Sequence, residues 1–480
     1  MLKKEKLEDG EHTNFTSIVK KSWPCLASYL TMAFTLAFLY INVLIISNII
    51  WPGEDFRSTE IGLLFGISTY IMAFSGLLFG NLADRISRIK LFSICTFLFG
   101  LGFIINGFAP EGLGLITYSF FIFCVFIRGF FSGGFWPLIN SYITDSSLED
   151  ERSHFFGILN TLFQLFQLAG MILAAFMFQS GLWRYYFWMI GSAICVVGIF
   201  ILRGEEPKRA SKREELKEIM HDTNIYYEYR LNIESIKGTI FKPTNLIAFG
   251  EGIFTTILLS VPDFLLVAYI QSSPYNFSPI TSSLFMIVFG VPGTIIGSIV
   301  FAKLSDKLSK RDIKNRIYLI VFSLIGIFTT FMIVFLLPLQ HFTVSQGNNL
   351  IIVLSFPIMW ILGLVALAAR SILGLYSINQ PPLIQKINLP EAQGFISSTN
   401  QFLESIGYGT GPILAGFLLE IFSQNYQITV TLTMSIGIVG AFLWLIATKW
   451  IDRDAARISR ILSERKDELN SKSKGMKSPK

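Results

Sequence analysis

The sequence is poor in the residues that build soluble surfaces and metal or nucleotide sites. Only 15% of its 480 residues are charged, whereas an average soluble domain has about a quarter. It has four histidines and four cysteines, and none of the cysteines forms a CxxC pair. The signatures GxxxxGK[ST], GxGxxG, HExxH and GxSxG are also missing. We therefore expect no metal, no cofactor, no ATP drive and no enzymatic activity.

Apolar residues dominate instead. Hydrophobic residues make up 52% of the chain, phenylalanine alone occurs 46 times, and the mean hydropathy is +0.55. A helix needs about 20 apolar residues to cross a bilayer, and long continuous runs favour helices over barrel strands. The sequence predicts an all-α membrane protein with twelve transmembrane helices, at residues 24–50, 61–82, 91–109, 115–143, 154–178, 184–202, 244–270, 280–304, 317–338, 350–378, 395–422 and 429–450.

The loops between these runs differ sharply in charge. Lysines and arginines number five in 1–22, three in 84–90 and six in 303–316, but none in 271–279 or 339–349. Basic loops stay on the cytoplasmic side of a membrane. We expect both termini in the cytoplasm, with the plasma membrane as the location, and we attribute the net charge of +6 to the bilayer and not to nucleic acid.

The charge pattern also divides the chain. We expect a six-helix half at 1–202, a charged cytoplasmic linker at 203–242, a second six-helix half at 243–451 and a basic tail at 452–480. The tail is expected to contact anionic lipid. We interpret the two six-helix halves as pseudo-repeats. Duplicated halves are typical of carriers that bind a solute between them, so we expect a monomeric carrier.

The two halves share features at matching places. The second run ends in Leu82-Ala83-Asp84-Arg85, and the eighth ends in Leu304-Ser305-Asp306-Lys307. The longer stretch from Gly80 to Lys90 looks like the loop signature G-x-L-a-D-r-x-G-r-k of the major facilitator superfamily, with Ser87 at the second glycine. Arg128-Gly129 resembles that superfamily's fourth-span arginine motif. The resemblance implies the major facilitator fold and transport by alternating access.

A second resemblance is to spinster-like lipid transporters. Glu206-Pro207-Lys208-Arg209-Ala210 is similar to the E-P-x-R-G that follows their sixth span, and the stretches 388–394 and 407–412 are also similar to that group. The spinster pattern has an acidic residue seven positions after the fourth-span arginine. This chain has Phe135 there.

Polar residues inside the apolar runs are the candidates for a substrate site. Arg128 lies near the middle of its run, where a charge costs about 2.5–3.5 kcal/mol on insertion scales. It would anchor an anionic group of the substrate, or else make a structural ion pair or bind carbonyls. Asn160 and Gln164 lie one turn apart and would line a cavity or bond neighbouring helices. The expected substrate-binding residues are Arg128, Asn160, Gln164, Arg370 and Asn400.

Acidic residues inside the runs are the candidates for proton coupling. Asn400 and Glu404 lie at i and i+4 and should share a helix face. We expect Arg370 to pair with Glu404, which would leave Arg128 as the free positive charge of the cavity. Glu404 is therefore a candidate proton carrier.

Two further acids lie in the seventh run. Asp263 follows Pro262, which frees backbone carbonyls. This position marks either a proton or cation site, or a helix break on the side of the gate. Glu251 lies one turn inside the same run and is interpreted as reaching the interface. We assign proton coupling to Glu404 and Asp263.

A cytoplasmic gate is expected around the loop signature. Asp84 should lie beside the start of the eleventh run, near 394–397, where free amides and the helix dipole would hold its carboxylate. The alternative is that Asp84 only caps its own loop. The expected gate residues are Gly80, Asp84, Arg85, Arg88, Asp145, Glu151 and Arg152.

These patterns predict a secondary transporter of a small organic or amphipathic solute. The sequence leaves open whether the solute is anionic and whether transport is coupled to protons. The alternatives are a membrane-embedded enzyme, which would need a clustered catalytic set, and a non-transporting receptor on the same fold.

Overall fold

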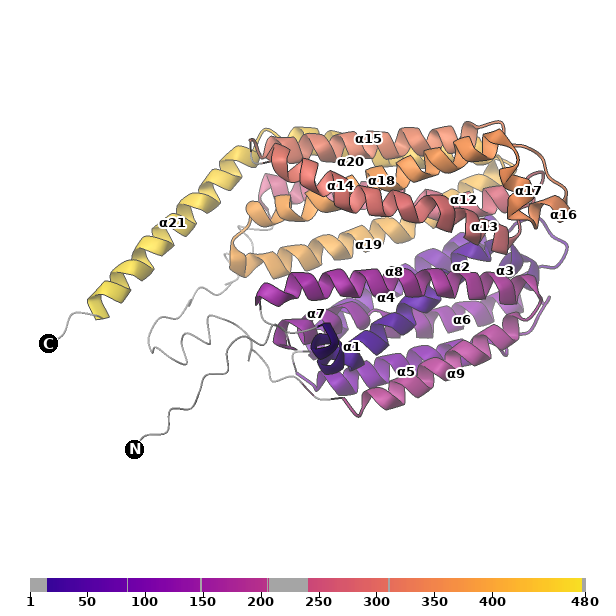
Figure 1. Cartoon of the computed structure of the whole chain (residues 1–480), viewed down its shortest axis with the longest axis horizontal. Helices are drawn as coiled ribbons and strands as arrows, with labels where there is room; N and C mark the ends of the chain where they lie inside the picture. Colours follow the sequence, from indigo (N-terminus) through magenta and orange to yellow (C-terminus); the bar gives the residue numbers. More distant parts are fainter. Residues whose placement is uncertain are drawn as a thin grey trace.

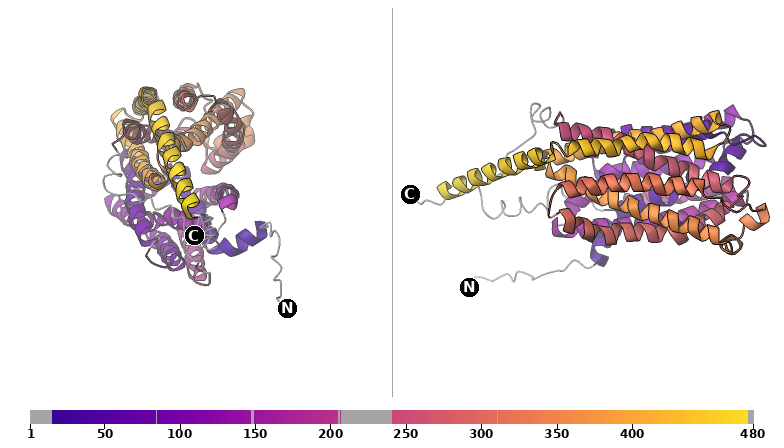
Figure 2. Two further views of the ribbon diagram at one scale, coloured as in Figure 1. Left: turned by 90° about the vertical axis from the view of Figure 1, so that its left-hand side faces the viewer. Right: turned by 90° about the horizontal axis from the view of Figure 1, so that it is seen from above.

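The computed structural model describes residues 15–83, 85–146, 149–204, 206, 241–309 and 311–476. Within this part of the chain, twelve helical segments are long and apolar enough to cross a membrane, as the sequence predicts. They form two bundles that lie side by side, one from each half of the chain (Figures 1 and 2). The expected linker at 203–242 lies almost entirely outside the described residues.

The first bundle contains the six spans of the N-terminal half. Several spans consist of more than one helix. In chain order the helices are α1 (Phe15–Leu36), α2 (Phe38–Ile41), α3 (Val43–Ile50), α4 (Ser58–Ala83), α5 (Arg88–Asn106), α6 (Leu115–Ser132), α7 (Phe135–Ser146), α8 (Glu149–Gln179) and α9 (Trp183–Ile201).

The second bundle contains the six spans of the C-terminal half, followed by one more helix. A π-helical turn, η1 (Met286–Gly290), lies in its second span. The α-helices are α12 (Pro243–Gln271), α13 (Pro279–Phe285), α14 (Val291–Ser309), α15 (Lys314–Leu336), α16 (Val344–Gly347), α17 (Leu350–Leu354), α18 (Pro357–Lys386), α19 (Pro390–Ile421), α20 (Tyr426–Ala447) and α21 (Ile451–Met476).

The first span is broken where the sequence predicts one continuous helix at 24–50. Asn42 is fully buried between α2 and α3, and its side-chain amide donates to the carbonyl of Phe38 at 2.9 Å. An asparagine that hydrogen-bonds nearby backbone competes with the helical ladder. Before this break, α2 packs on α8 of the first half and on α12 and α13 of the second.

The sequence predicts the tenth span at 350–378, whereas the observed helix, α18, runs from Pro357 to Lys386. A short separate helix, α17, precedes it. Proline has no amide hydrogen and is favoured in the first turn of a helix, so the long helix starts at Pro357. The fourth span is also divided, at the glycines 133 and 134 between α6 and α7.

The halves meet along α4 and α19, and α8 of the first half packs on α13 of the second. We call the end of the bundle from which α21 projects the proximal end, and the opposite end, with α3, α16 and α17, the distal end (Figure 1). Toward the distal end the contact between α4 and α19 is very close. A Cβ atom on Gly416 would lie 2.1 Å from the carbonyl oxygen of Ser58, and one on Gly62 would lie 2.3 Å from that of Pro412.

The basic tail forms a helix that the sequence analysis did not predict. α21 projects beyond the bundle (Figure 2). Its first turns are attached to the second half, because Asp452 pairs with Lys314 at 2.6 Å and Asp454 accepts a hydrogen bond from Thr244. Ile451 and Ile458 are buried.

Candidate functional site

A half-buried ion pair lies where the two halves meet. A terminal nitrogen of Arg370 on α18 donates to the Asp263 carboxylate on α12 at 2.9 Å, and the two side chains are 31% and 25% exposed. The expected pairing of Arg370 with Glu404 is therefore wrong. Both side chains thus keep part of their surface accessible.

The ion pair is connected to the N-terminal half by two tyrosines. The hydroxyl of Tyr408 on α19 donates to the second oxygen of Asp263 at 2.9 Å. The hydroxyl of Tyr40 on α2 then donates to that of Tyr408, at 3.4 Å. One chain of polar contacts thus runs through four helices and both halves. We call Asp263, Arg370, Tyr408 and Tyr40 the central site.

A second polar cluster surrounds Glu404. Its Oε1 atom accepts hydrogen bonds from Asn400 and from Gln380 on α18, both at 2.6 Å. The predicted i, i+4 contact between Asn400 and Glu404 is confirmed. Neighbouring Glu251 is fully buried, so the interpretation that it reaches the interface is wrong.

Arg128 lies inside the first half. It is 7% exposed, and its guanidinium carbon lies 4.9 Å and 4.8 Å from the ring centres of Phe38 and Phe103. A Cβ atom on Gly102 would lie 2.8 Å from its Cγ, so this glycine makes room for the arginine stem. The first span is also interrupted at Ala37, between α1 and α2, and Phe38 directly after this interruption places its ring over the guanidinium. Arg128 is thus held by cation–π contacts, each worth about 0.5–2 kcal/mol. Its Nε also donates to the carbonyl of Cys124 at 3.4 Å, which is one of the structural roles that the sequence left open.

The predicted polar stripe of α8 is only partly described. Gln164 is exposed on α8 and is not part of the central site. The side chain of Asn160 lies outside the described residues, so its role in lining a cavity stays a prediction.

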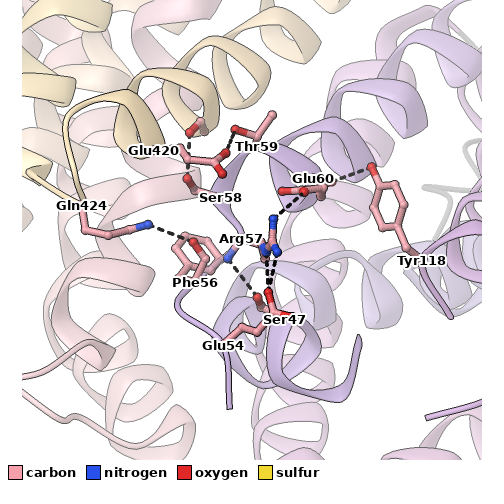
Figure 3. A network of polar contacts seen from close by, with 11 residues as sticks. Ser47, Glu54, Phe56, Arg57, Ser58, Thr59, Glu60, Tyr118, Glu420 and Gln424 are labelled. Carbon is pink, nitrogen blue, oxygen red and sulfur yellow. Dashed lines mark hydrogen bonds and ion pairs between the residues drawn. The ribbon is translucent and has the colours of Figure 1, made fainter. Parts of the chain in front are cut away.

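At the distal end, polar contacts join Phe56 and the first residues of α4 to the last turns of α19 and the residues just after it (Figure 3). Ser58 donates to the carbonyl of Gly416 at 2.7 Å, and Gln424 donates to the carbonyl of Phe56 at 3.0 Å. Thr59 donates to the Glu420 carboxylate. We call these six residues the distal latch. They hold the two halves together on this side.

The loop before α4, which carries Phe56 of the latch, is itself braced within the first half. Arg57 bonds the Glu54 carboxylate through two nitrogens and lies 3.5 Å from that of Glu60. Tyr118 donates to the carbonyl of Glu60 at 2.9 Å (Figure 3). This bracing orders the loop, so the latch does not depend on a flexible segment.

A cavity of about 530 Å³ opens beside the latch. Its lining comes from both halves and includes Glu54, Asp55, Tyr269, Tyr275 and Gln427. Its lining residue on α12, Tyr269, lies on the distal side of Asp263.

Comparison with known proteins agrees with this geometry. The family model described as Major Facilitator Superfamily matches residues 30–377. The chain belongs to the major facilitator superfamily. Among solved structures, a bacterial homolog of the human lysosomal transporter Spinster has a TM-score of 0.66 at 16% identity, over 90% of this chain and 98% of that one. That likeness shows the fold.

The curated relatives are also transporters. The multidrug resistance protein 1 of Bacillus subtilis is 23% identical over 85% of this chain and 93% of its own length. The D-xylose transporter of Levilactobacillus brevis is 26% identical over 49% of this chain. The chain spans only 35%, 54% and 56% of the first three curated relatives, so their substrates are not transferred to it.

The superfamily loop signature lies at the proximal end, between α4 and α5. Arg88 is 3% exposed and donates from Nε to Ser141 of α7 at 2.7 Å, so this contact stays within the first half. Gly80 is half-buried and Arg85 is exposed. Asp84 and the side chains of Asp145, Glu151 and Arg152 lie outside the described residues, so the predicted gate around Asp84 stays a prediction.

A further contact of this signature involves Glu206, a residue to which the sequence analysis gave no role. Its carboxylate accepts the amides of Arg88 and Ile89, both at 3.0 Å, and the hydroxyl of Ser87 at 2.5 Å. It thus occupies the start of α5, where free amides and the dipole favour an anion. The sequence does contain a signal for this role, because Glu206 is the acid of the stretch after the sixth span that resembles spinster-like transporters.

Glu206 lies outside the spans and can titrate against water. Partial burial raises the pKa of its carboxyl, but the hydrogen bonds that it accepts outweigh burial and lower the pKa below its ordinary value. A lowered pKa in the folded state stabilises the ionised form. This contribution is complete above the ordinary glutamate pKa of about 4.3 and is lost as the pH falls through the lowered value.

Proposed function

We propose that this protein is a proton-coupled secondary transporter that moves a small organic anion by alternating access. The observation that carries the proposal is the half-buried pair of Asp263 and Arg370, linked through Tyr408 to the opposite half. Charged groups inside a membrane bundle are costly and mark solute or proton pathways by default.

In this proposal the solute anion competes with Asp263 for Arg370. A guanidinium offers a planar fork that matches a carboxylate or phosphate. When the anion binds, Asp263 loses its counter-charge and takes up a proton. Protonation of Asp263 also weakens the hydrogen bonds from Tyr40 through Tyr408 to Asp263. Solute binding is in this way transmitted to the contact between the halves. The distal latch is the element that must then open.

An anion screen tests the substrate class. Aliphatic and aromatic carboxylates and phosphate monoesters, compared with neutral sugars, should include members that raise the thermal stability of the purified protein. At a ligand concentration 100 times the Kd, the gain is about 2.7 kcal/mol. Arg370→Gln should abolish this gain, and Arg370→Lys should lose most of it, because an ammonium lacks the fork.

Arg128→Lys is the matched control for this screen, since its guanidinium lies between aromatic rings. It should lower the starting stability yet keep the gain from the anion. Stabilisation by neutral sugars alone, equal in wild type and Arg370→Gln, would reject the anionic substrate.

We also propose that the proximal end faces the cytoplasm and the distal end the outside of the plasma membrane. The Lys/Arg asymmetry of the loops supports this orientation. The exposed positions Lys90 and Ser345 lie at opposite ends of the bundle. In a background without the four buried cysteines, an impermeant thiol reagent added to intact cells should label Ser345→Cys and not Lys90→Cys. Labelling of Lys90→Cys alone would reverse the orientation.

A further inference from the structure

Glu251 is a fully buried acid that the central site does not use. It lies on α12, in the proximal half of that helix, and its side chain is 0% exposed. Its Oε1 accepts hydrogen bonds from Thr255 at 2.5 Å and from Tyr376 of α18 at 3.1 Å. Its Oε2 is buried and has no hydrogen-bond partner. One oxygen is thus satisfied and the other is not.

The groups that face Glu251 come from three neighbouring helices. α18 contributes the hydroxyl of Tyr376, α19 contributes the carboxylate of Glu404, and α20 contributes the indole of Trp444. The indole N–H of Trp444 faces the Glu251 carboxyl but makes no hydrogen bond of normal geometry with it or with any other group. Within the described residues, no salt bridge includes either glutamate, so no described cation balances them.

Adjacent turns of α18 hold the carboxyl groups of Glu251 and Glu404. Tyr376 donates to Glu251, and Gln380, four residues on, donates to Glu404. Between α12 and α19 the contact is close, since a Cβ atom on Gly252 would lie 3.0 Å from Cγ of Glu404. Unlike Glu251, Glu404 is only half-buried.

Two ionised carboxylates close together, one of them fully buried and neither paired with a described cation, are very unfavourable, and a shared proton removes most of the cost. We propose that Glu251 and Glu404 form a two-carboxyl proton site within the C-terminal half. One proton from water forms an O–H bond on one carboxyl and leaves the other ionised. It returns to water through the half-buried Glu404, and no other atom is exchanged.

The proton binding follows from the cluster itself, while its coupling to transport rests on the proposed function. The site is separate from the central site, whose acid is already paired with Arg370. Its residues lie on α12, α18 and α19, which are also the helices that carry Asp263, Arg370 and Tyr408. A change in its protonation can therefore alter the packing that positions the central site.

Infrared spectroscopy of the purified protein tests the proton binding without any substrate. Wild type should show the carbonyl stretch of a buried, protonated carboxylic acid, and this band should be lost in Glu251→Gln. Glu404→Gln should change the pH dependence of the band, since the two groups share the proton. Glu111→Gln is the matched control, because Glu111 is exposed and paired with Arg184 at 3.3 Å; it should leave the band unchanged.

Tyr376→Phe keeps the test valid if Glu251→Gln does not fold. It removes one hydrogen bond from the carboxyl and should shift the band without abolishing it. A band that is unchanged in both Glu251→Gln and Tyr376→Phe would overturn the proton site.

Distances between spin labels on the two halves, measured across a pH series, separate this inference from the proposed function. Distances that respond to pH in wild type and not in Glu251→Gln support both the proton site and its coupling to transport. A band that depends on Glu251, together with distances that ignore pH, supports the proton site and rejects proton coupling. A band independent of Glu251 rejects the site, whatever the distances show.

Discussion

Replacing Gly416 with alanine is expected to shift the protein away from the distally closed conformation by a factor of about 5 to 150. The added Cβ would lie 2.1 Å from the backbone carbonyl oxygen of Ser58, a contact that a rotamer change cannot relieve. Overpacking of this kind costs about 1–3 kcal/mol, and a conformational equilibrium responds to that free energy by the stated factor. Separation of the halves removes the contact, so the open form does not carry the cost.

Spin-label distances across the distal end measure this shift. Gly62→Ala should act in the same direction, because its Cβ would meet the carbonyl oxygen of Pro412 at 2.3 Å. Gly250→Ala is the matched control: its Cβ would meet only Leu443, at 3.6 Å, which is ordinary contact. Distal distances in Gly416→Ala that match those of Gly250→Ala would show that the close contact does not set the closed state.

Hydropathy alone predicts the number of spans, because every helix that crosses a bilayer must satisfy its own backbone and present apolar side chains. It does not predict where a span breaks. The break at Asn42 depends on one side-chain amide that reaches the carbonyl of Phe38, and the start of α18 depends on Pro357 and not on the apolar residues before it. Both are local polar or steric effects inside apolar sequence.

Depth in the membrane does not select the partner of Arg370. At 1.5 Å per residue, Arg370 lies about 20 Å from the start of α18 at Pro357. By the same measure Asp263 lies about 12 Å from the distal end of α12, and Glu404 about 26 Å from that of α19, so both acids lie at similar distances in depth from Arg370. The observed bond to Asp263 therefore depends on how the helices are rotated.

Other features of the site depend on rotation of the helices about their axes, which a sequence pattern does not determine. The cost of burying charge correctly identified Arg128, Asp263, Arg370 and Glu404 as unusual. That cost does not say whether a charge is balanced by an acid, by aromatic rings or by amides. Here Arg128 is held by rings, and Glu404 by amides.

Removal of one member of the central ion pair is expected to destabilise the protein more than removal of both. Arg370→Gln leaves the Asp263 carboxylate with only its hydrogen bond from Tyr408, and losing a hydrogen bond to a charged group costs about 1.5–3 kcal/mol. Asp263→Asn leaves the guanidinium without its counter-charge. In the double variant neither charge remains, so part of the loss should be recovered, with a coupling free energy of about 0.5–3 kcal/mol.

Thermal unfolding of the four proteins in detergent, at fixed lipid and pH, measures this cycle. The pair of Arg184 and Glu111 is the matched control, because it lies at the surface and its side chains are 33% and 52% exposed. Exposed pairs contribute about 0–1 kcal/mol, so the Arg184→Gln and Glu111→Gln cycle should show little coupling. If both cycles gave the same small value, solvent would already screen the central pair. Arg370 would then be free to bind an anion without first releasing Asp263, and the competition on which the proposed mechanism depends would not exist.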